Sequence, residues 1–150
     1  MTKFLFTDKC QIEILSKEKL IIFDQQEVLK FNTEDTAVFH HGTGEKVTEY
    51  SGLATDKNEE RSWAKADFEV GGFSPQHYHL LRTKDYYIVS MQAKVSIIVE
   101  GKDHLLTTGD HLRVLPNQRQ QIINRSENNK CSLIVKCTPS WILSDFICLK

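Results

Sequence analysis

The sequence lacks long apolar runs, an excess of charge of one sign, and the Gly and Pro content of low-complexity chains. It has 3 Pro and 7 Gly among 150 residues, which excludes collagen-like architectures. The 19 Lys and Arg balance 20 Asp and Glu, so the basic excess of a nucleic-acid-binding protein or a polybasic membrane anchor is missing. No apolar run approaches the roughly 20 residues of a membrane helix. We therefore expect a globular protein with no nucleic acid and no membrane as a partner.

Targeting and cysteine motifs are also missing. The segment from Met1 to Cys10 has no basic stretch followed by an apolar core, so we expect a cytoplasmic protein. The 4 Cys include no C-x-x-C pair that would favour zinc or redox chemistry. Cys131 and Cys137 share a strand face with Leu133 and Val135, which predicts reduced thiols packed in a core.

Motifs of several enzyme classes are absent as well. We find no nucleophilic Ser or Cys elbow, and no pair of carboxylates suited to glycoside hydrolysis. His40-His41 precedes Gly42-Thr43-Gly44, but these glycines lack the spacing of a phosphate-binding loop. We interpret this segment as a loop or the end of a hairpin.

Short apolar segments separated by turn residues dominate the second half of the chain. Ala66, Phe68 and Val70 alternate with acidic residues, which is the period of a half-buried strand. The other strands that we predict are Tyr86–Met91, Val95–Val99, His104–Leu106, His111–Leu115, Gln120–Asn124 and Ser132–Thr138. This spacing predicts an all-β sandwich or small barrel.

The two ends of the chain are less regular. Strands are predicted at Ile12–Leu15, Leu20–Phe23, Val28–Phe31 and Ala37–His40, although Glu18 to Lys30 also fits a partial helix. Ile142, Phe146 and Leu149 have the spacing of a short amphipathic helix that Ser140 could cap. With no repeat or linker, we expect one domain, divided into residues 1–65 (N-terminal strands and loops), 66–138 (the main barrel) and 139–150 (a C-terminal helix or tail).

The most informative segment is Gly71-Gly72-Phe73-Ser74-Pro75-Gln76-His77-Tyr78-His79. Residues two apart on a strand point to the same side, so His77 and His79 would present both imidazoles to one space. Neutral imidazole is a common ligand of first-row metals, and two of them supply half of a typical site. The pair also fits a simple polar strand face.

This segment, followed by Gly109-Asp110, the break at Pro116 and Asn124, resembles the two motifs of the cupin superfamily. The first motif is G-x5-H-x-H with a later Glu and Gly, and the second runs from Gly-Asp through a turn containing Pro to a His and an Asn. The resemblance covers residues 66 to 138, and Cys137-Thr138-Pro139 is similar to the way small cupins leave the barrel.

Two of the four metal ligands of that family are replaced. Lys84 stands at the position of the glutamate, with Asp85 next to it, and Met91 replaces the closing glycine. Gln120 stands at the position of the third histidine. A lysine adds a cation where a divalent metal would bind, and an amide oxygen is a poorer ligand than imidazole. Asn117 replaces a turn glycine, which Asn can do because it tolerates a left-handed backbone.

The resemblance implies an all-β, cupin-type double-stranded β-helix (jelly-roll) barrel with extra N-terminal strands and a short C-terminal helix. It also implies a homodimer, and it leaves open a divalent metal (Zn, Fe, Ni or Mn) held by His77, His79, Asp85 and Gln120. The expected pocket is lined by Phe73, Tyr87 or Tyr86, Met91, Arg113 and Gln120 around the two histidines. Arg113 either binds a carboxylate or phosphate of a ligand or is an exposed arginine of an edge strand.

Three functions remain open at this stage. In the first, the barrel binds a small molecule, a sugar or an anionic metabolite, through His77, His79, Lys84 and Gln120. In the second, it is an isomerase, epimerase, lyase or dioxygenase with His77 or His79 as the catalytic acid or base, or as a ligand of a metal. In the third, it is a structural or interaction protein with a relic pocket. Residue types alone do not decide among them, because one fold hosts many chemistries.

Overall fold

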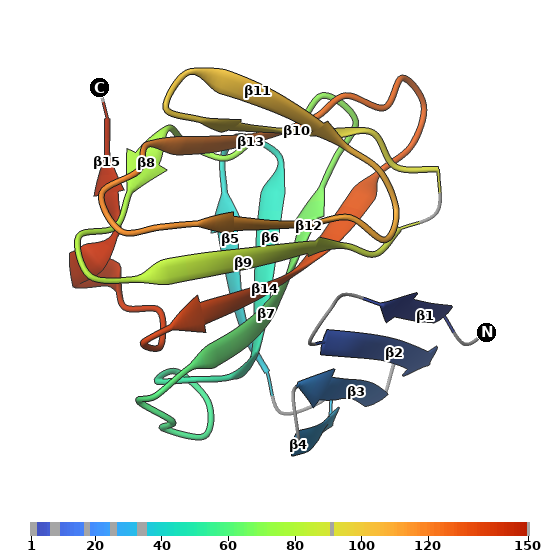
Figure 1. The fold of residues 1–150 in the computed structure, drawn as a ribbon, viewed down its shortest axis with the longest axis vertical. Coiled ribbons are helices and arrows are strands. Elements are labelled where there is room, and N and C mark those ends of the chain that lie inside the picture. The colour runs from blue at the N-terminus through green and yellow to red at the C-terminus, as the bar shows by residue number, and fades with distance from the viewer. Residues whose placement is uncertain are drawn as a thin grey trace.

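A computed structural model describes the backbone of the strands in residues 3–32, and residues 36–90 and 92–149 with their side chains. Figure 1 shows an all-β molecule in which two curved sheets form a barrel and four N-terminal strands form a sheet of their own. The all-β barrel predicted from the sequence is confirmed. Among the described residues, no helix has the length and apolar character needed to span a membrane.

The N-terminal sheet is an antiparallel meander. It consists of β1 (Lys3–Phe6), β2 (Cys10–Ser16), β3 (Lys19–Asp24) and β4 (Glu27–Asn32), paired in chain order. The predicted extra strands are confirmed, whereas the partial helix considered for Glu18 to Lys30 is wrong. Ile21, Ile22, Phe23 and Val28 are β-branched or aromatic, and such residues favour a strand over a helix.

The larger barrel sheet has six strands. In sheet order these are β12 (His111–Val114), β9 (Thr83–Ile88), β14 (Cys131–Thr138), β7 (Ser62–Phe68), β6 (Glu45–Ser51) and β5 (Ala37–His41). Every pairing in it is antiparallel. Alternate residues of these strands therefore point into the barrel or away from it.

The second barrel sheet has five strands. In sheet order these are β11 (Lys102–Leu106), β10 (Val95–Val99), β13 (Gln120–Asn124), β8 (His77–Tyr78) and β15 (Ile147–Cys148). β8 and β15 are short, and in β8 His77 pairs with Gln120 on one side and Cys148 on the other. The register of β8 therefore places His77 next to Gln120.

The core lies between the two barrel sheets. It is built from fully buried aliphatic and aromatic side chains, which include Phe68, Ile88, Val95, Ile97 and Leu133. Each such side chain stabilises the fold by about 1.5–3 kcal/mol relative to an exposed position. The predicted core positions of Cys131 and Cys137 are confirmed, since both are buried free thiols.

Two glycines join the hairpin β5–β6 to the loop before β8. A Cβ added to Gly72 would lie 2.9 Å from the carbonyl oxygen of Gly44, and one added to Gly44 would lie 3.2 Å from the Cα of Gly72. The backbones are also hydrogen-bonded, from Glu69 N to Gly44 O (3.0 Å) and from Phe73 N to Thr43 O (3.0 Å). Only glycine permits this approach.

The C-terminal segment is not the amphipathic helix that the spacing of Ile142, Phe146 and Leu149 predicts. It contains a single turn of 3-10 helix, Leu143–Asp145, and then β15. The cap also differs, because the Ser140 hydroxyl donates to Asn58 O (2.6 Å) and caps no helix. Two backbone bonds of the 3-10 turn lie within the segment, and its other hydrogen bonds are made with residues of other segments, where an α-helix would bond to itself.

Candidate functional site

A cavity of about 420 Å³ opens between the two sheets of the barrel. The six-stranded sheet provides its floor, β8 and β13 provide one wall, and the C-terminal segment covers it. Its polar and titratable lining consists of His40, His41, Glu45, Glu49, Ser62, Ser74, His77, Lys84, Tyr86 and Cys137. Its apolar lining includes Val38, Phe39, Trp141, Leu143 and Phe146 near the rim.

His77 lies in this cavity with a defined tautomer. Its Nδ1 is 2.7 Å from the carbonyl oxygen of Pro75, which can only accept a hydrogen bond, so Nδ1 carries the proton. Nε2 is then left with its lone pair as an acceptor, a base or a metal ligand. Burial, together with the charge of Lys84, lowers the pKa of His77 to about 4, although the bond to Pro75 acts in the opposite direction. The imidazole is therefore neutral at pH 7.

His79 lies beside His77, as the two-residue spacing predicts. The ring centroids are 5.1 Å apart at 89°, and Phe146 contacts both rings. His79 is 1% exposed, and neither of its ring nitrogens has a hydrogen-bond partner among the described residues. Burial, and then the charge of Lys84, lower its pKa to about 3. His79 is thus a neutral imidazole packed behind the cavity wall.

The lining groups that the sequence analysis missed include His41 and Glu45. They flank the turn of the hairpin β5–β6, with His41 Nε2 3.7 Å from Glu45 Oε1. The prediction of a hairpin end for His40-His41 is correct, but His41 faces the cavity. Burial raises the pKa of Glu45 to about 7, even though Lys84 acts to lower it. The only sequence signal was a charged residue at an inward position of a strand.

Lys84 and Tyr86 point into the cavity from β9, as cross-strand neighbours of Val114 and Leu112. Lys84 Nζ lies 5.9 Å from the centre of the Tyr86 ring, and no ion pair of Lys84 with a carboxylate occurs in the part of the chain described with side chains. Gln120 is buried, and its Oε1 accepts a hydrogen bond from the Tyr86 hydroxyl. Lys84, Tyr86 and His77 thus line the cavity, whereas Gln120 does not line it and is bound to Tyr86.

Asp85 and Tyr87 occupy the opposite face of β9. The Asp85 carboxylate is 2.8 Å from both His111 Nε2 and Arg113 Nε, and Tyr87 stacks on the His111 ring at 4.6 Å. Burial alone would raise the pKa of Asp85, but these hydrogen bonds lower it. None of Asp85, Tyr87 and Arg113 lines the cavity.

The remaining predicted contacts are placed as follows. Arg113 belongs to the edge strand β12, and its side chain is 60% exposed. It therefore matches the alternative of an exposed arginine on an edge strand. Phe73 is 39% exposed and does not line the cavity, and Met91 lies outside the described residues. Asn117 has a φ of 70°, the left-handed conformation expected of a glycine replacement.

The donors of this cavity do not fit a transition-metal site of the cupin type. Of the two imidazoles only that of His77 lines the cavity, and the carboxylate of Asp85 is bound to Arg113 on the other face of the sheet. Lys84 places an ammonium group in the cavity, and the Gln120 amide oxygen is engaged by Tyr86. Within residues 36–90 and 92–149 no three His, Cys, Asp or Glu side chains form a group that could hold a metal.

The groups that are present belong to general acid–base chemistry. At neutral pH the cavity contains an imidazole with a free acceptor nitrogen, a carboxyl group that titrates near pH 7, and an ammonium group. Proton transfers need groups whose pKa values lie near the working pH, and an adjacent cation stabilises a developing oxyanion. The arrangement can therefore bind a polar molecule and exchange protons with it.

Replacing Glu45 tests the environment of this carboxyl group. Because its pKa is raised in the fold, its contribution to stability is present below pH 4.5 and is lost as the pH rises through about 7. We expect the wild type to lose about 3 kcal/mol relative to Glu45→Gln between pH 4.5 and 8. Urea unfolding across this range measures the difference, with the exposed Glu127→Gln as the matched control. Parallel curves for the wild type and Glu45→Gln would contradict the assignment.

Comparison with known proteins supports the fold. No family model and no curated protein matches the sequence. A Streptomyces Pac13 variant with uridine is similar, with a TM-score of 0.67 and 16% identity over 81% of this chain and 90% of that chain. Pac13 is described as a nucleoside dehydratase.

Two other solved structures are similar over most of their length. An RmlC-like cupin from Shewanella frigidimarina NCIMB 400 has a TM-score of 0.58 and 24% identity over 71% of this chain and 86% of that chain. KdgF from Halomonas sp. has a TM-score of 0.60 and 14% identity over 73% of this chain and 91% of that chain. Together with the two barrel sheets and the position of the histidine pair, these similarities show that the chain has the cupin fold.

Proposed function

We propose that the barrel cavity binds a small metabolite, a sugar or an anionic molecule, whose charged or carbonyl oxygen is bound by Lys84. The observation that carries the proposal is the Lys84 ammonium group. It points into the cavity without an ion pair to any carboxylate of the side chains that the structure describes. An anionic ligand would supply the missing partner.

The size and the lining of the cavity support this proposal. A volume of about 420 Å³ lies within the range of small-molecule sites, which combine an apolar wall with a few convergent polar groups. Near the rim, the Phe39 and Trp141 rings are 5.9 Å apart at 46°, and they offer aromatic surface to a planar ring or to the apolar face of a sugar. His77 Nε2 and Glu45 can bind hydroxyl groups deeper inside.

The similarity to Pac13 suggests which ligands to try first. Its variant was solved with uridine, a ribose joined to a planar base. This combination of a sugar and an aromatic ring matches a cavity with a polar interior and an aromatic rim. At 16% identity the similarity is one of fold, so uridine is one member of a panel rather than the expected ligand.

Binding is tested by thermal unfolding and calorimetry with glucose, glucuronate, uridine and uridine monophosphate. We expect the anionic member of each pair to bind more tightly than its neutral partner. At a free concentration of 100 times Kd, a ligand should stabilise the protein by about 2.7 kcal/mol. Lys84→Met should weaken binding of the anion at least about tenfold, because it removes a charge-assisted hydrogen bond.

The matched control is Lys102→Met, which removes an exposed lysine of β11. It should leave the affinity for the anion unchanged. The proposal is wrong if Lys84→Met and Lys102→Met bind the anion with equal affinity, or if no member of the panel stabilises the wild type.

A further inference from the structure

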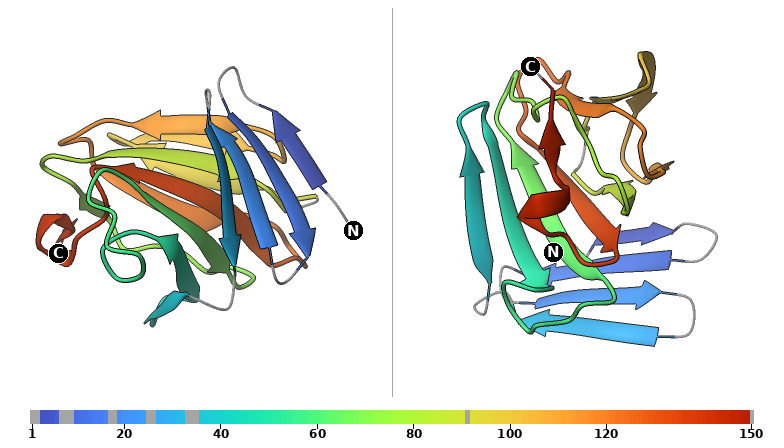
Figure 2. Two further views of the ribbon diagram at one scale, coloured as in Figure 1. Left: turned by 90° about the horizontal axis from the view of Figure 1, so that it is seen from below. Right: turned by 90° about the vertical axis from the view of Figure 1, so that its left-hand side faces the viewer.

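The C-terminal segment forms one side of the cavity and joins the barrel sheets only through the short edge strand β15. It contributes Trp141, Leu143 and Phe146 to the lining, and Phe146 lies against the His77 ring with centroids 4.4 Å apart. In the right-hand view of Figure 2 this segment, in dark red, crosses the open end of the barrel between the two sheets. A molecule that enters from this end therefore meets the segment first.

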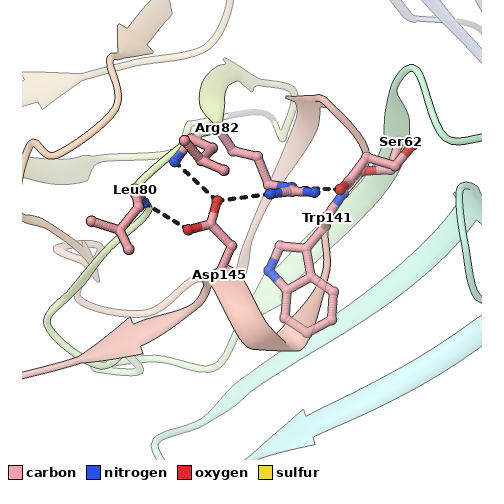
Figure 3. Close-up of polar contacts among 7 residues, drawn as sticks. Ser62, Leu80, Arg82, Trp141 and Asp145 are labelled. Carbon is pink, nitrogen blue, oxygen red and sulfur yellow. Dashed lines mark hydrogen bonds and ion pairs between the residues drawn. The ribbon is translucent and has the colours of Figure 1, made fainter.

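One buried carboxylate holds this segment to the barrel. Asp145 accepts hydrogen bonds from Leu80 N (2.7 Å), Leu81 N (3.1 Å) and Arg82 Nη1 (2.9 Å). Figure 3 shows the carboxylate facing the Leu80 backbone and the Arg82 guanidinium group. Arg82 Nε also donates to Ser140 O (2.7 Å), so Arg82 binds the segment near both ends of the 3-10 turn.

The other polar attachments are few and are concentrated at the two ends. At the start, Ser140 N donates to Glu59 O (3.1 Å) and Trp141 N donates to Ser62 Oγ (2.9 Å). At the end, β15 forms two pairs with β8, and Leu149 N donates to Gln76 O (2.8 Å). The middle of the segment is held by Asp145 and by apolar contacts of side chains that line the cavity.

We propose that residues 140–148 form a cover that opens as a unit to admit molecules to the cavity, and that Asp145 is the latch of this cover. Opening either barrel sheet would require more free energy than releasing the cover, because each inner strand is hydrogen-bonded on both sides. Releasing the cover breaks one charged cluster and a few backbone bonds. Entry of a ligand depends on the function proposed above, whereas the opening itself is tested without a ligand.

Hydrogen exchange of the full chain measures the opening. Asp145→Asn removes the charge at nearly constant volume and leaves donors of Leu81 or Arg82 unpaired. We expect the amides of Trp141 and Leu149 to exchange at least about tenfold faster, as for loss of a charged hydrogen bond. These amides donate to Ser62 and Gln76, so Asp145 does not protect them directly. Amides of β7, β9 and β14 should keep their wild-type rates.

The matched control is Asp103→Asn, an exposed aspartate of β11, which should change no rate in the segment. Ser62→Ala removes only the acceptor of Trp141 N and provides a milder variant in case Asp145→Asn folds poorly; it should accelerate Leu149 exchange, and less than Asp145→Asn does. The latch is refuted if Asp145→Asn accelerates exchange equally in the segment and in the barrel strands, or accelerates neither.

A second experiment measures access to the cavity. Diethyl pyrocarbonate modifies neutral imidazoles, and His77 presents a free Nε2 inside the cavity, whereas His104 of β11 is partly exposed and does not line the cavity. We expect Asp145→Asn to raise the modification rate of His77 at least about tenfold relative to that of His104, because the cover is open for a larger fraction of the time. An unchanged ratio of the two rates would show that small molecules reach the cavity without release of the cover.

Discussion

Lowering the pH from 6.5 to about 4 should destabilise this protein steeply, because two buried imidazoles must take up protons. His77 and His79 have pKa values of about 4 and about 3 in the fold, against 6.5 for a free histidine. A group whose pKa is lowered in this way contributes stability above pH 6.5 and loses it as the pH falls toward its value in the fold. The full losses are about 3 kcal/mol for His77 and about 5 kcal/mol for His79.

Glu45 acts in the opposite direction. Its contribution decreases as the pH rises from 4.5 to about 7, so it cancels part of the histidine effect in the interval that they share. Above pH 6.5 only the loss due to Glu45 remains. We therefore expect the free energy of unfolding to be greatest near pH 6.5 and to fall on both sides, more steeply on the acid side.

Denaturant unfolding at several pH values, followed by tryptophan fluorescence, tests this expectation. Replacing His79 by Leu removes one buried proton acceptor at similar volume, and the acid slope should decrease by about 1.4 kcal/mol per pH unit. His40→Leu is the matched control, because it removes an exposed imidazole from the same chain. If the acid slope is the same in wild type, His79→Leu and His40→Leu, the histidine pair does not govern acid stability.

The double substitution Lys84→Glu with Gln120→His should create a metal site where the wild-type donors do not form one. Lys84 lines the cavity from β9, and Gln120 pairs with His77 across β13 and β8. The two changes remove a cation, add a carboxylate and add a third imidazole beside the histidine pair. Imidazole and carboxylate oxygen are suitable ligands for Zn²⁺ and Ni²⁺.

We expect the double variant to bind Zn²⁺ or Ni²⁺ at least about 100-fold more tightly than the wild type, which corresponds to about 3 kcal/mol. Calorimetry with chelator-treated protein measures the affinity, and elemental analysis of untagged protein measures the metal that is carried through purification. Each single substitution is a control that lacks one donor, and adding His77→Ala to the double variant should remove the gain. Equal metal affinity of wild type and double variant would show that His77 and His79 cannot bind one ion together.

The strands were predictable because their pattern is local. β10 and β13 begin and end at the predicted residues, and β12 and β14 differ by one residue at one end. Glu100 and Gly101 form the turn before β11, both with positive φ. Turn residues and alternating apolar residues act over a few positions, so a sequence carries this information without the fold.

The direction of each side chain was harder to predict. Tyr86 and Tyr87 are both buried, one inside the barrel and one on the outer face beside Trp63, so neither hydrophobicity nor alternation separates them. A shift of one residue in the predicted strand likewise exchanges Lys84, which lines the cavity, with Asp85, which lies on the opposite face of β9. Because the period of a strand is two, an error of one residue reverses every assignment of a site residue.

The burial of charged residues inside the barrel was also hard to predict from the sequence. Glu45 and His41 lie in a segment rich in charge, where a solvated surface is the ordinary reading. Their burial depends on strands far away in the sequence, since the cavity also needs β9, β14 and the C-terminal segment. The absence of an α-helix at residues 139–149 has the same origin, because the Asp145 carboxylate binds Leu80 and Arg82, which are distant in the sequence.

The contact between Gly44 and Gly72 makes the spacing of the cavity walls independent of the side chains that line the cavity. It fixes the spacing between the hairpin that bears His41 and Glu45 and the loop that leads to His77, and it does so through backbone atoms alone. The side chains that meet a ligand can therefore be exchanged without altering the distance between the walls that carry them. A lineage of such barrels could change its ligands one side chain at a time, while any residue larger than glycine at either position would force the walls apart.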